Sequence, residues 1–173
     1  MNLITQPNLW SCSIAAAAMI LDINIQTLIG IIGHDGSEIV FPKLQEPGNR
    51  RGFHIQEIID CAIELGYFVT PIEILPYSTP DGKNEFPINF SEGNSHRLLK
   101  YVSKTKGILT GLGNKWYHAM AWDGKNIYDP NGYIYPFHDC KINLDCYWIF
   151  IEKEKEKRFN LLPQFKASQQ GSV

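Results

Sequence analysis

The stretch Ser11-Cys12-Ser13-Ile14-Ala15-Ala16-Ala17-Ala18-Met19-Ile20-Leu21 decides the fold that we predict for this chain. It consists mainly of strong helix formers and is apolar on every face. Ser11 stands where an N-cap residue belongs, and Asp22-Ile23-Asn24 breaks the run. Because a helix that is apolar all round must be surrounded by other elements, we expect residues 11–21 to form a buried central helix.

Two further helices are predicted after this one. Residues 25–32 can form a short helix, which Gly33-His34-Asp35-Gly36 ends with residues suited to turns. Residues 54–65 form an amphipathic helix with Gly66 at the C′ position. Its apolar side consists of Ile55, Ile58, Ile59, Ala62 and Ile63. The segment 37–52 between them, with its prolines and glycines, is predicted to be an irregular loop.

The rest of the chain is predicted to be mainly β-structure. Residues 67–75 resemble a strand interrupted by Pro71, which predicts an edge position or a bend there. A polar excursion over residues 77–94 and a short helix near 95–105 come next. Short β-prone runs separated by turn signals follow at 107–113, 117–122, 126–128, 132–136 and 146–152. Helices followed by antiparallel strands predict an α+β fold.

Length and composition favour one soluble domain. A chain of 173 residues suffices for a single core, which we place at residues 1–158, with helices in about 1–66, the sheet in about 67–158 and a tail at 159–173. The formal net charge of −2 gives no footprint for nucleic acid or an anionic membrane. No run is apolar for long enough to span a bilayer, and no signal peptide is evident, so we expect a cytoplasmic protein, with export by a dedicated system left open.

The cysteines point to reactive or core thiols and away from a disulfide scaffold. Cys12, Cys61, Cys140 and Cys146 include no Cys-x-x-Cys pair, so reduced thiols are expected. The order His138, Cys140, Cys146 lacks the paired chelating units of structural zinc sites, and we predict no metal and no other cofactor. Cys61 lies on the apolar side of its helix and is expected in the core.

Cys12 and Gln6 are the first two candidate site residues. A thiol attacks as thiolate, and a helix N-terminus and a neighbouring imidazolium both favour that form. Cys12 stands where the central helix should begin, although a cysteine before four alanines is also the pattern of a small core residue. Gln6 lies six positions earlier. A side-chain amide there can join the backbone N–H of Cys12 in stabilising an oxyanion, which favours a catalytic role for both residues.

His118 and Asp129 complete the candidate set. The run from Tyr117 to Gly132 is predicted to be a hairpin that turns at residues 123–125. His118 then lies near the beginning of one strand and Asp129 near the end of the other, which makes them near cross-strand neighbours, as a base and its orienting carboxylate must be. Asn131 is an alternative third member.

These two windows resemble the papain-like cysteine peptidases, and in particular the bacteriocin-processing (double-glycine leader) branch. The likeness is sharp only over residues 6–19, with the Gln-x5-Cys entry, and over 118–130, with the His strand and the later Asp-Pro. It implies a papain-like fold, with Cys12 as nucleophile, His118 as general base and acid, Asp129 as its orienting residue and Gln6 as oxyanion donor. Ser13 departs from the pattern, because Gly or Trp is frequent in relatives after the nucleophile.

The resemblance implies a thiol peptidase or amidase that acts on a peptide, isopeptide or small amide through a thioester. Acyl or amine transfer, as in transglutaminase-like toxins, uses the same residues, because a thioester does not dictate its acceptor. A non-catalytic binding module and a cell-wall amidase of the NlpC/P60 type are further alternatives. Trp10, Trp116 and Tyr117 flank the candidate residues and are expected to line the substrate cleft. The sequence specifies neither the substrate nor an oligomeric state.

Overall fold

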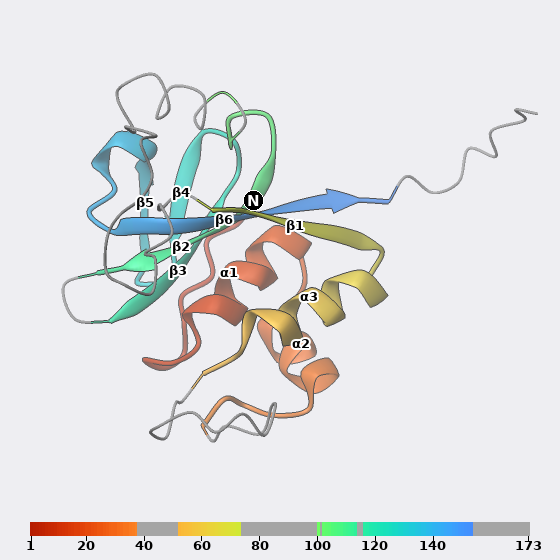
Figure 1. The fold of residues 1–173 in the computed structure, drawn as a ribbon. Helices are drawn as coiled ribbons and strands as arrows, with labels where there is room; N and C mark the ends of the chain where they lie inside the picture. The colour runs from red at the N-terminus through yellow and green to blue at the C-terminus, as the bar shows by residue number, and fades with distance from the viewer. Residues whose placement is uncertain (38–51, 74–99, 101, 114–115, 154–173) are drawn as a thin grey trace, which may run out of the picture.

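The α+β fold is confirmed by a computed structural model, which describes residues 1–37, 52–73, 100, 102–113 and 116–153. Three helices of the described residues lie on one face of a six-stranded antiparallel sheet (Figure 1). The helices are α1 (Cys12–Leu21), α2 (Ile25–Ile32) and α3 (Ile55–Glu64). The strands are β1 (Tyr67–Glu73), β2 (Lys106–Leu112), β3 (Tyr117–Trp122), β4 (Asn126–Asp129), β5 (Tyr133–Pro136) and β6 (Asn143–Glu152). The predicted excursion at 77–94, most of the helix near 95–105 and the tail at 159–173 lie outside the described residues.

The central helix is as buried as its composition predicts. From Ile14 to Leu21 every residue of α1 is at most 5% exposed. Asp22 ends the helix in the left-handed conformation, with φ of 55°. No helix of the described residues is long and apolar enough to cross a membrane by itself. Only α1 and α2 taken together reach the required length and composition, and they meet at a bend of 111°.

The sheet has the order β1-β6-β2-β3-β4-β5, which leaves β1 and β5 at its edges. The edge position predicted from Pro71 is therefore confirmed, although the strand runs through the proline without interruption. Strand β6 begins at Asn143, three residues earlier than predicted. Its register with β2 shifts between Thr110 and Gly111, and the Thr110 hydroxyl donates to Oδ1 of Asp145 at 2.8 Å beside this bulge. The bulge lies in the first residues of the strand, before the β-prone run from which the strand was predicted.

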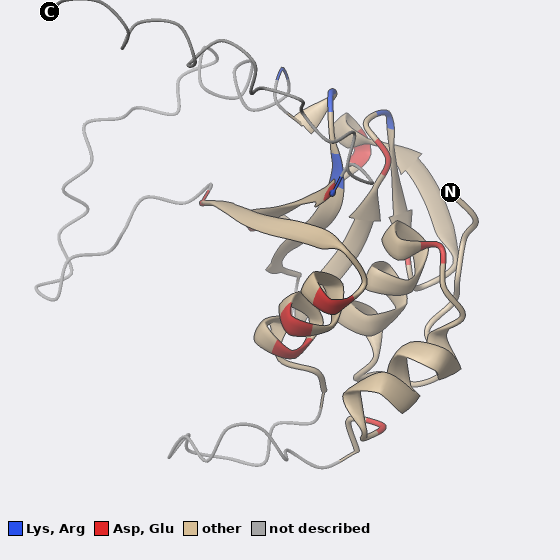
Figure 2. Ribbon diagram, turned by 90° about the vertical axis from the view of Figure 1, so that its right-hand side faces the viewer, with Lys and Arg blue, Asp and Glu red and all other residues tan. Residues whose placement is uncertain are grey.

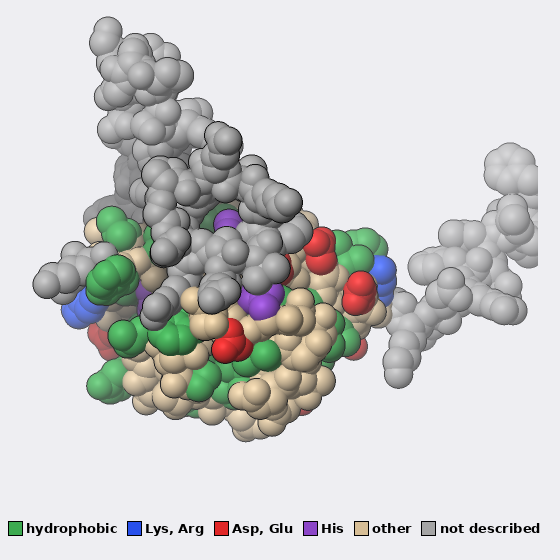
Figure 3. All heavy atoms as spheres, turned by 90° about the horizontal axis from the view of Figure 1, so that it is seen from below, with side chains coloured by type: hydrophobic (Ala, Val, Ile, Leu, Met, Phe, Trp, Pro, Cys, Tyr) green, Lys and Arg blue, Asp and Glu red, His purple; other side chains and the backbone are tan. Residues whose placement is uncertain are grey.

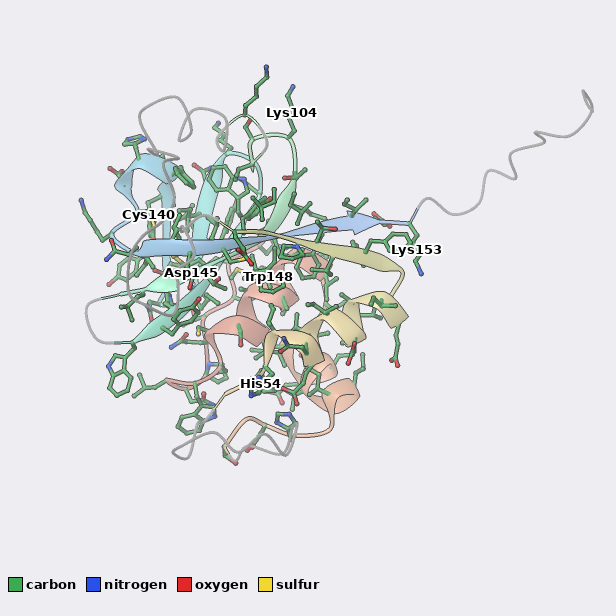
Figure 4. All side chains as sticks on the ribbon, in the orientation of Figure 1. His54, Lys104, Cys140, Asp145, Trp148 and Lys153 are labelled. Carbon is green, nitrogen blue, oxygen red and sulfur yellow. The ribbon has the colours of Figure 1, made fainter. Side chains whose placement is uncertain are left out.

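The helices cover one face of the sheet, and two sets of contacts show in which direction α1 runs across it. Ile108, Ala119 and Ala121 belong to the buried cluster that includes α1, whereas Leu109, Met120 and Trp122 form a second cluster with other strand residues. At the C-terminal end of α1, the Lys106 ammonium donates to the carbonyl of Ile20 at 3.0 Å. The N-terminus of α1, with Cys12, therefore points toward the end of β3 at which His118 lies. Trp148, on β6, also packs against the helix-side cluster (Figure 4).

A histidine–carboxylate pair links the end of α2 to the start of α3. Nε2 of His34 lies 2.7 Å from Oε1 of Glu57, and the His34 ring stacks on Phe53. Oε2 of Glu57 also accepts from the backbone N–H of His54, the N-cap of α3, at 2.8 Å. From the sequence, His34 was placed only in a turn, and its contact with Glu57 was not predicted because Glu57 lies 23 positions away. His54 does lie at the helix boundary, as predicted. Glu57 lies in the first turn of α3, and Figure 2 shows acidic side chains at several places along this helix.

We expect Glu57→Ala to lower the free energy of unfolding by about 1–3 kcal/mol, because it removes a capping interaction and leaves His34 without its carboxylate. Urea unfolding followed by circular dichroism measures this change. Asp60→Ala is the matched control, since Asp60 lies exposed on the same helix. Equal stability of the two variants would show that the pair does not brace α2 against α3.

Candidate active site

His118 and Asp129 meet at one end of the β3–β4 pair. His118 is the second residue of β3 and Asp129 is the last of β4. Nε2 of His118 lies 2.8 Å from Oδ1 of Asp129, and Asp129 is only 7% exposed. A carboxylate that is buried against an imidazole fixes the ring and stabilises its protonated form. The predicted pairing of these two residues is thus present in the structure.

The register that brings them together differs from the one used to predict it. The observed pairs are Ala121↔Tyr128 and Trp122↔Ile127. Continued toward the end of the hairpin, this register sets Met120 opposite Asp129 and Asn131 opposite His118. His118 and Asp129 are therefore diagonal neighbours, which long side chains can still join. Position alone favours Asn131 as the partner, and the side-chain contact favours Asp129.

Asn131 contacts both members of the pair. Its side-chain nitrogen lies 3.3 Å from Nε2 of His118, which is longer than the 2.8 Å contact of Asp129. Its backbone N–H donates to Oδ1 of Asp129 at 2.8 Å. Burial raises the pKa of Asp129, but the hydrogen bonds from His118 and from the Asn131 backbone outweigh it and lower this pKa below its ordinary value. Asp129 is therefore charged at neutral pH, and Asn131 helps to keep it so.

The third contact is with Cys12. Burial lowers the pKa of His118, but hydrogen bonds with Asp129 and with Cys12, and the charges of both, outweigh it and raise the pKa to about 9. Cys12 is thus a second side-chain partner of this ring, beside the Asp129 carboxylate. Cys12 is partly exposed at the first position of α1. The imidazole thus lies between a sulfur and a carboxylate, in the order that a thiol nucleophile, its base and an orienting group require.

The loop before Cys12 is held by Asn8, a residue that sequence reasoning did not single out. Oδ1 of Asn8 accepts from the backbone N–H of Trp10 at 3.1 Å and from the Ser11 hydroxyl at 2.8 Å. Ser11 is the N-cap by position, as predicted, but its side chain makes no capping hydrogen bond to α1. The Ser11 side chain therefore does not occupy the N–H groups of the first turn, which an oxyanion at this helix end would need as donors.

Gln6 is attached to the same end of the sheet. Its backbone N–H donates to the carbonyl of Pro130 at 2.9 Å, directly after Asp129. Its side-chain oxygen is buried and has no hydrogen-bond partner among the described residues. The role predicted for Gln6 requires the nitrogen of this amide to donate. The backbone contact brings the segment of Gln6 beside the hairpin that carries His118 and Asp129.

The other three cysteines are in different surroundings. Burial raises the pKa of Cys61, of Cys140 and of Cys146, the last to about 11 with a contribution from the charge of Asp145. Asp145 and Cys140 are labelled in Figure 4. Cys61 is buried, as expected of a core residue. No group of three His, Cys, Asp or Glu side chains within the described ranges is placed to hold a metal ion.

The three aromatic candidates for the cleft wall differ in exposure. Trp116 and Tyr117 are 80% and 59% exposed, and Tyr117 pairs across the sheet with Leu112, itself 52% exposed. Trp10 is partly buried, and its indole N–H donates to the carbonyl of Asp35 at 3.3 Å. In the space-filling view of Figure 3, apolar side chains appear at the surface of the described part of the molecule. Trp116 and Tyr117 directly precede His118, so their exposed surface adjoins the candidate site.

Comparison with protein-family models and with curated proteins finds no match to this chain.

Proposed function

We propose that this protein is a papain-like cysteine hydrolase, a peptidase or amidase, similar to the bacteriocin-processing branch. The observation that carries the proposal is the placement of His118, which contacts Cys12 and lies 2.8 Å from the Asp129 carboxylate. Either contact alone is common in protein cores. Here one partly buried imidazole makes both contacts, and the cysteine lies at the N-terminus of a helix. This combination is what thioester chemistry requires.

The proposed reaction has two stages. The Cys12 sulfur attacks the substrate carbonyl carbon as a thiolate, and the resulting oxyanion is held by the backbone N–H of Cys12 and by Gln6. The C–N bond breaks when His118 gives its proton to the leaving amine, and a thioester remains on Cys12. Because its pKa is raised to about 9, His118 carries this proton at neutral pH. A water molecule then gives a proton to His118 and attacks the thioester, which releases the acid and restores the Cys12 thiolate beside protonated His118.

The proposed substrate is a peptide that brings an apolar side chain next to its scissile bond. Leu112 and Tyr117 are cross-strand partners next to the Gly111–His118 pair, and both side chains are more than half exposed. A substrate bound at Cys12 would therefore extend over them and over Trp116. Exposed apolar side chains beside a nucleophile favour apolar substrate groups over charged ones.

Trp116→Ala tests this surface. We expect the KM for a peptide substrate with an apolar residue beside the cleaved bond to rise about 10-fold with kcat little changed, since burial of one large apolar side chain contributes about 1.5 kcal/mol. Ile151→Ala is the control, because Ile151 is 50% exposed on the distant end of β6. An unchanged KM would remove Trp116 from the proposed cleft.

The reaction class is tested with a library of peptides incubated with the wild-type chain and with Cys12→Ala. New peptide termini formed by the wild type alone, and identified by mass spectrometry, would support hydrolysis. The incubation is repeated with an added primary amine. If the products carry the added amine and no new carboxylic acids are formed, the reaction is acyl transfer and not hydrolysis. No product in either incubation, with Cys12 no more reactive than the other thiols, would favour the non-catalytic binding module.

A further inference from the structure

Tyr135 closes the side of Asp129 that faces away from His118. It lies on β5, where it pairs with Ile127 of β4, and its ring packs against the cluster that contains Met120. Its hydroxyl lies 3.1 Å from Oδ2 of Asp129 and 3.2 Å from the Met120 sulfur. No feature of the sequence points to this residue, because the contact depends on the register of a short edge strand.

The Tyr135 hydroxyl has one proton and two acceptors within reach. A carboxylate oxygen is a much stronger acceptor than a thioether sulfur, so the proton goes to Asp129. Burial and the charge of Asp129 raise the pKa of Tyr135 above its ordinary value. The group therefore stays a hydroxyl, and a donor, over the whole range in which an enzyme of this kind would work.

The two oxygens of Asp129 thus have separate partners. Oδ1 accepts from His118 and from the backbone of Asn131, and Oδ2 accepts from Tyr135. We propose that Tyr135 is a positioning residue, whose hydroxyl holds Oδ2 so that Oδ1 stays on the imidazole of His118. The effect of Tyr135 on catalysis rests on the proposed function, whereas its contact with Asp129 is independent of that function.

Loss of the hydroxyl has a defined electrostatic consequence. Asp129 is 7% exposed, so water replaces a lost donor poorly. A carboxylate with fewer donors takes up a proton at higher pH. The pKa of Asp129 is depressed in the folded chain, so the stability that its charge contributes is lost as the pH falls through that value. Without Tyr135 this loss should occur at a higher pH.

Tyr135→Phe in the full chain is the test, because it keeps the ring in the core and removes only the oxygen. The titration of Asp129, followed by NMR of its side-chain carboxyl carbon, should move up by about one pH unit. The rate of Cys12 alkylation by iodoacetamide at pH 6 should fall about 3–10-fold. Tyr133→Phe is the control on the same strand, since Tyr133 is 64% exposed.

The two readouts separate this inference from the proposed function. An Asp129 titration that does not move in Tyr135→Phe would overturn the positioning role, whatever the thiol does. If the Asp129 titration moves, the contact with Tyr135 is established. If wild-type Cys12 also reacts no faster than the other cysteines, the catalytic proposal is wrong although the contact exists. A merely structural tyrosine would lower the unfolding temperature and leave the titration in place.

Discussion

His118→Ala is expected to lower the rate at which iodoacetamide alkylates Cys12 at pH 6 at least about 100-fold. An ordinary cysteine thiol is ionised to well under 1% at that pH, and the imidazolium is the charged group that contacts this sulfur in the structure. The same change is expected to remove peptide turnover, because His118 is the group that gives its proton to the leaving amine in the proposed mechanism. Alkylation is measured by mass spectrometry of the Cys12 peptide over time.

The control for this variant is His138→Ala, because the His138 side chain is 81% exposed and lies on the short helical turn after β5. It should alkylate at the wild-type rate. If His118→Ala also does so, the contact between the ring and Cys12 has no chemical consequence, and the thiolate on which the proposed mechanism depends is absent.

The second large effect is expected at the third member of the site. Asp129→Ala should lower kcat about 10³–10⁴-fold, since it removes both the acceptor that fixes the ring and the charge that stabilises the imidazolium. Asn131→Ala should lower kcat less than about 10-fold, because the Asn131 backbone N–H, which supports Asp129, remains. The two variants are compared in kcat with one peptide substrate.

A reversed order of these two effects would make Asn131 the orienting residue. The structure gives this outcome a definite basis, since the continued strand register places Asn131 opposite His118 and its amide lies 3.3 Å from the ring. The shorter contact and the charge of Asp129 are the reasons to expect the opposite.

Much of the fold could be predicted because it depends on local signals. The apolar run from Ile14 to Leu21 has to be enclosed, and it is. Pro71 lacks an N–H and therefore belongs on an edge strand, where β1 lies. Gly66 and Gly124 take positive φ where the chain turns. The early start of β6 was missed because its first residues, which include the bulge at Asp145, lie before the β-prone run from which the strand was predicted.

In the candidate site, too, the contacts that depend on local sequence could be predicted and those that depend on strand packing could not. Cys12 and Gln6 could be related by their spacing along the chain, and His118 and Asp129 by a hairpin count. The bond between the last two was predicted, but from a register that is not the observed one. Tyr135 could not be found, because its contact with Asp129 depends on how β5 docks against β4. Asn8 carries a weak signal, since an Asn two residues before a turn position often bonds the backbone there.

The central claim, that Cys12 is a nucleophile activated by its surroundings, is tested most directly by limiting alkylation of the folded wild-type chain at pH 6–7. All four cysteines compete for a trace of iodoacetamide, and peptide mapping gives the share of label on each. We predict that nearly all of the label is found on Cys12, with Cys61, Cys140 and Cys146 held back by burial. Label spread evenly over the four thiols, or a Cys12 that stays unmodified, would contradict the account.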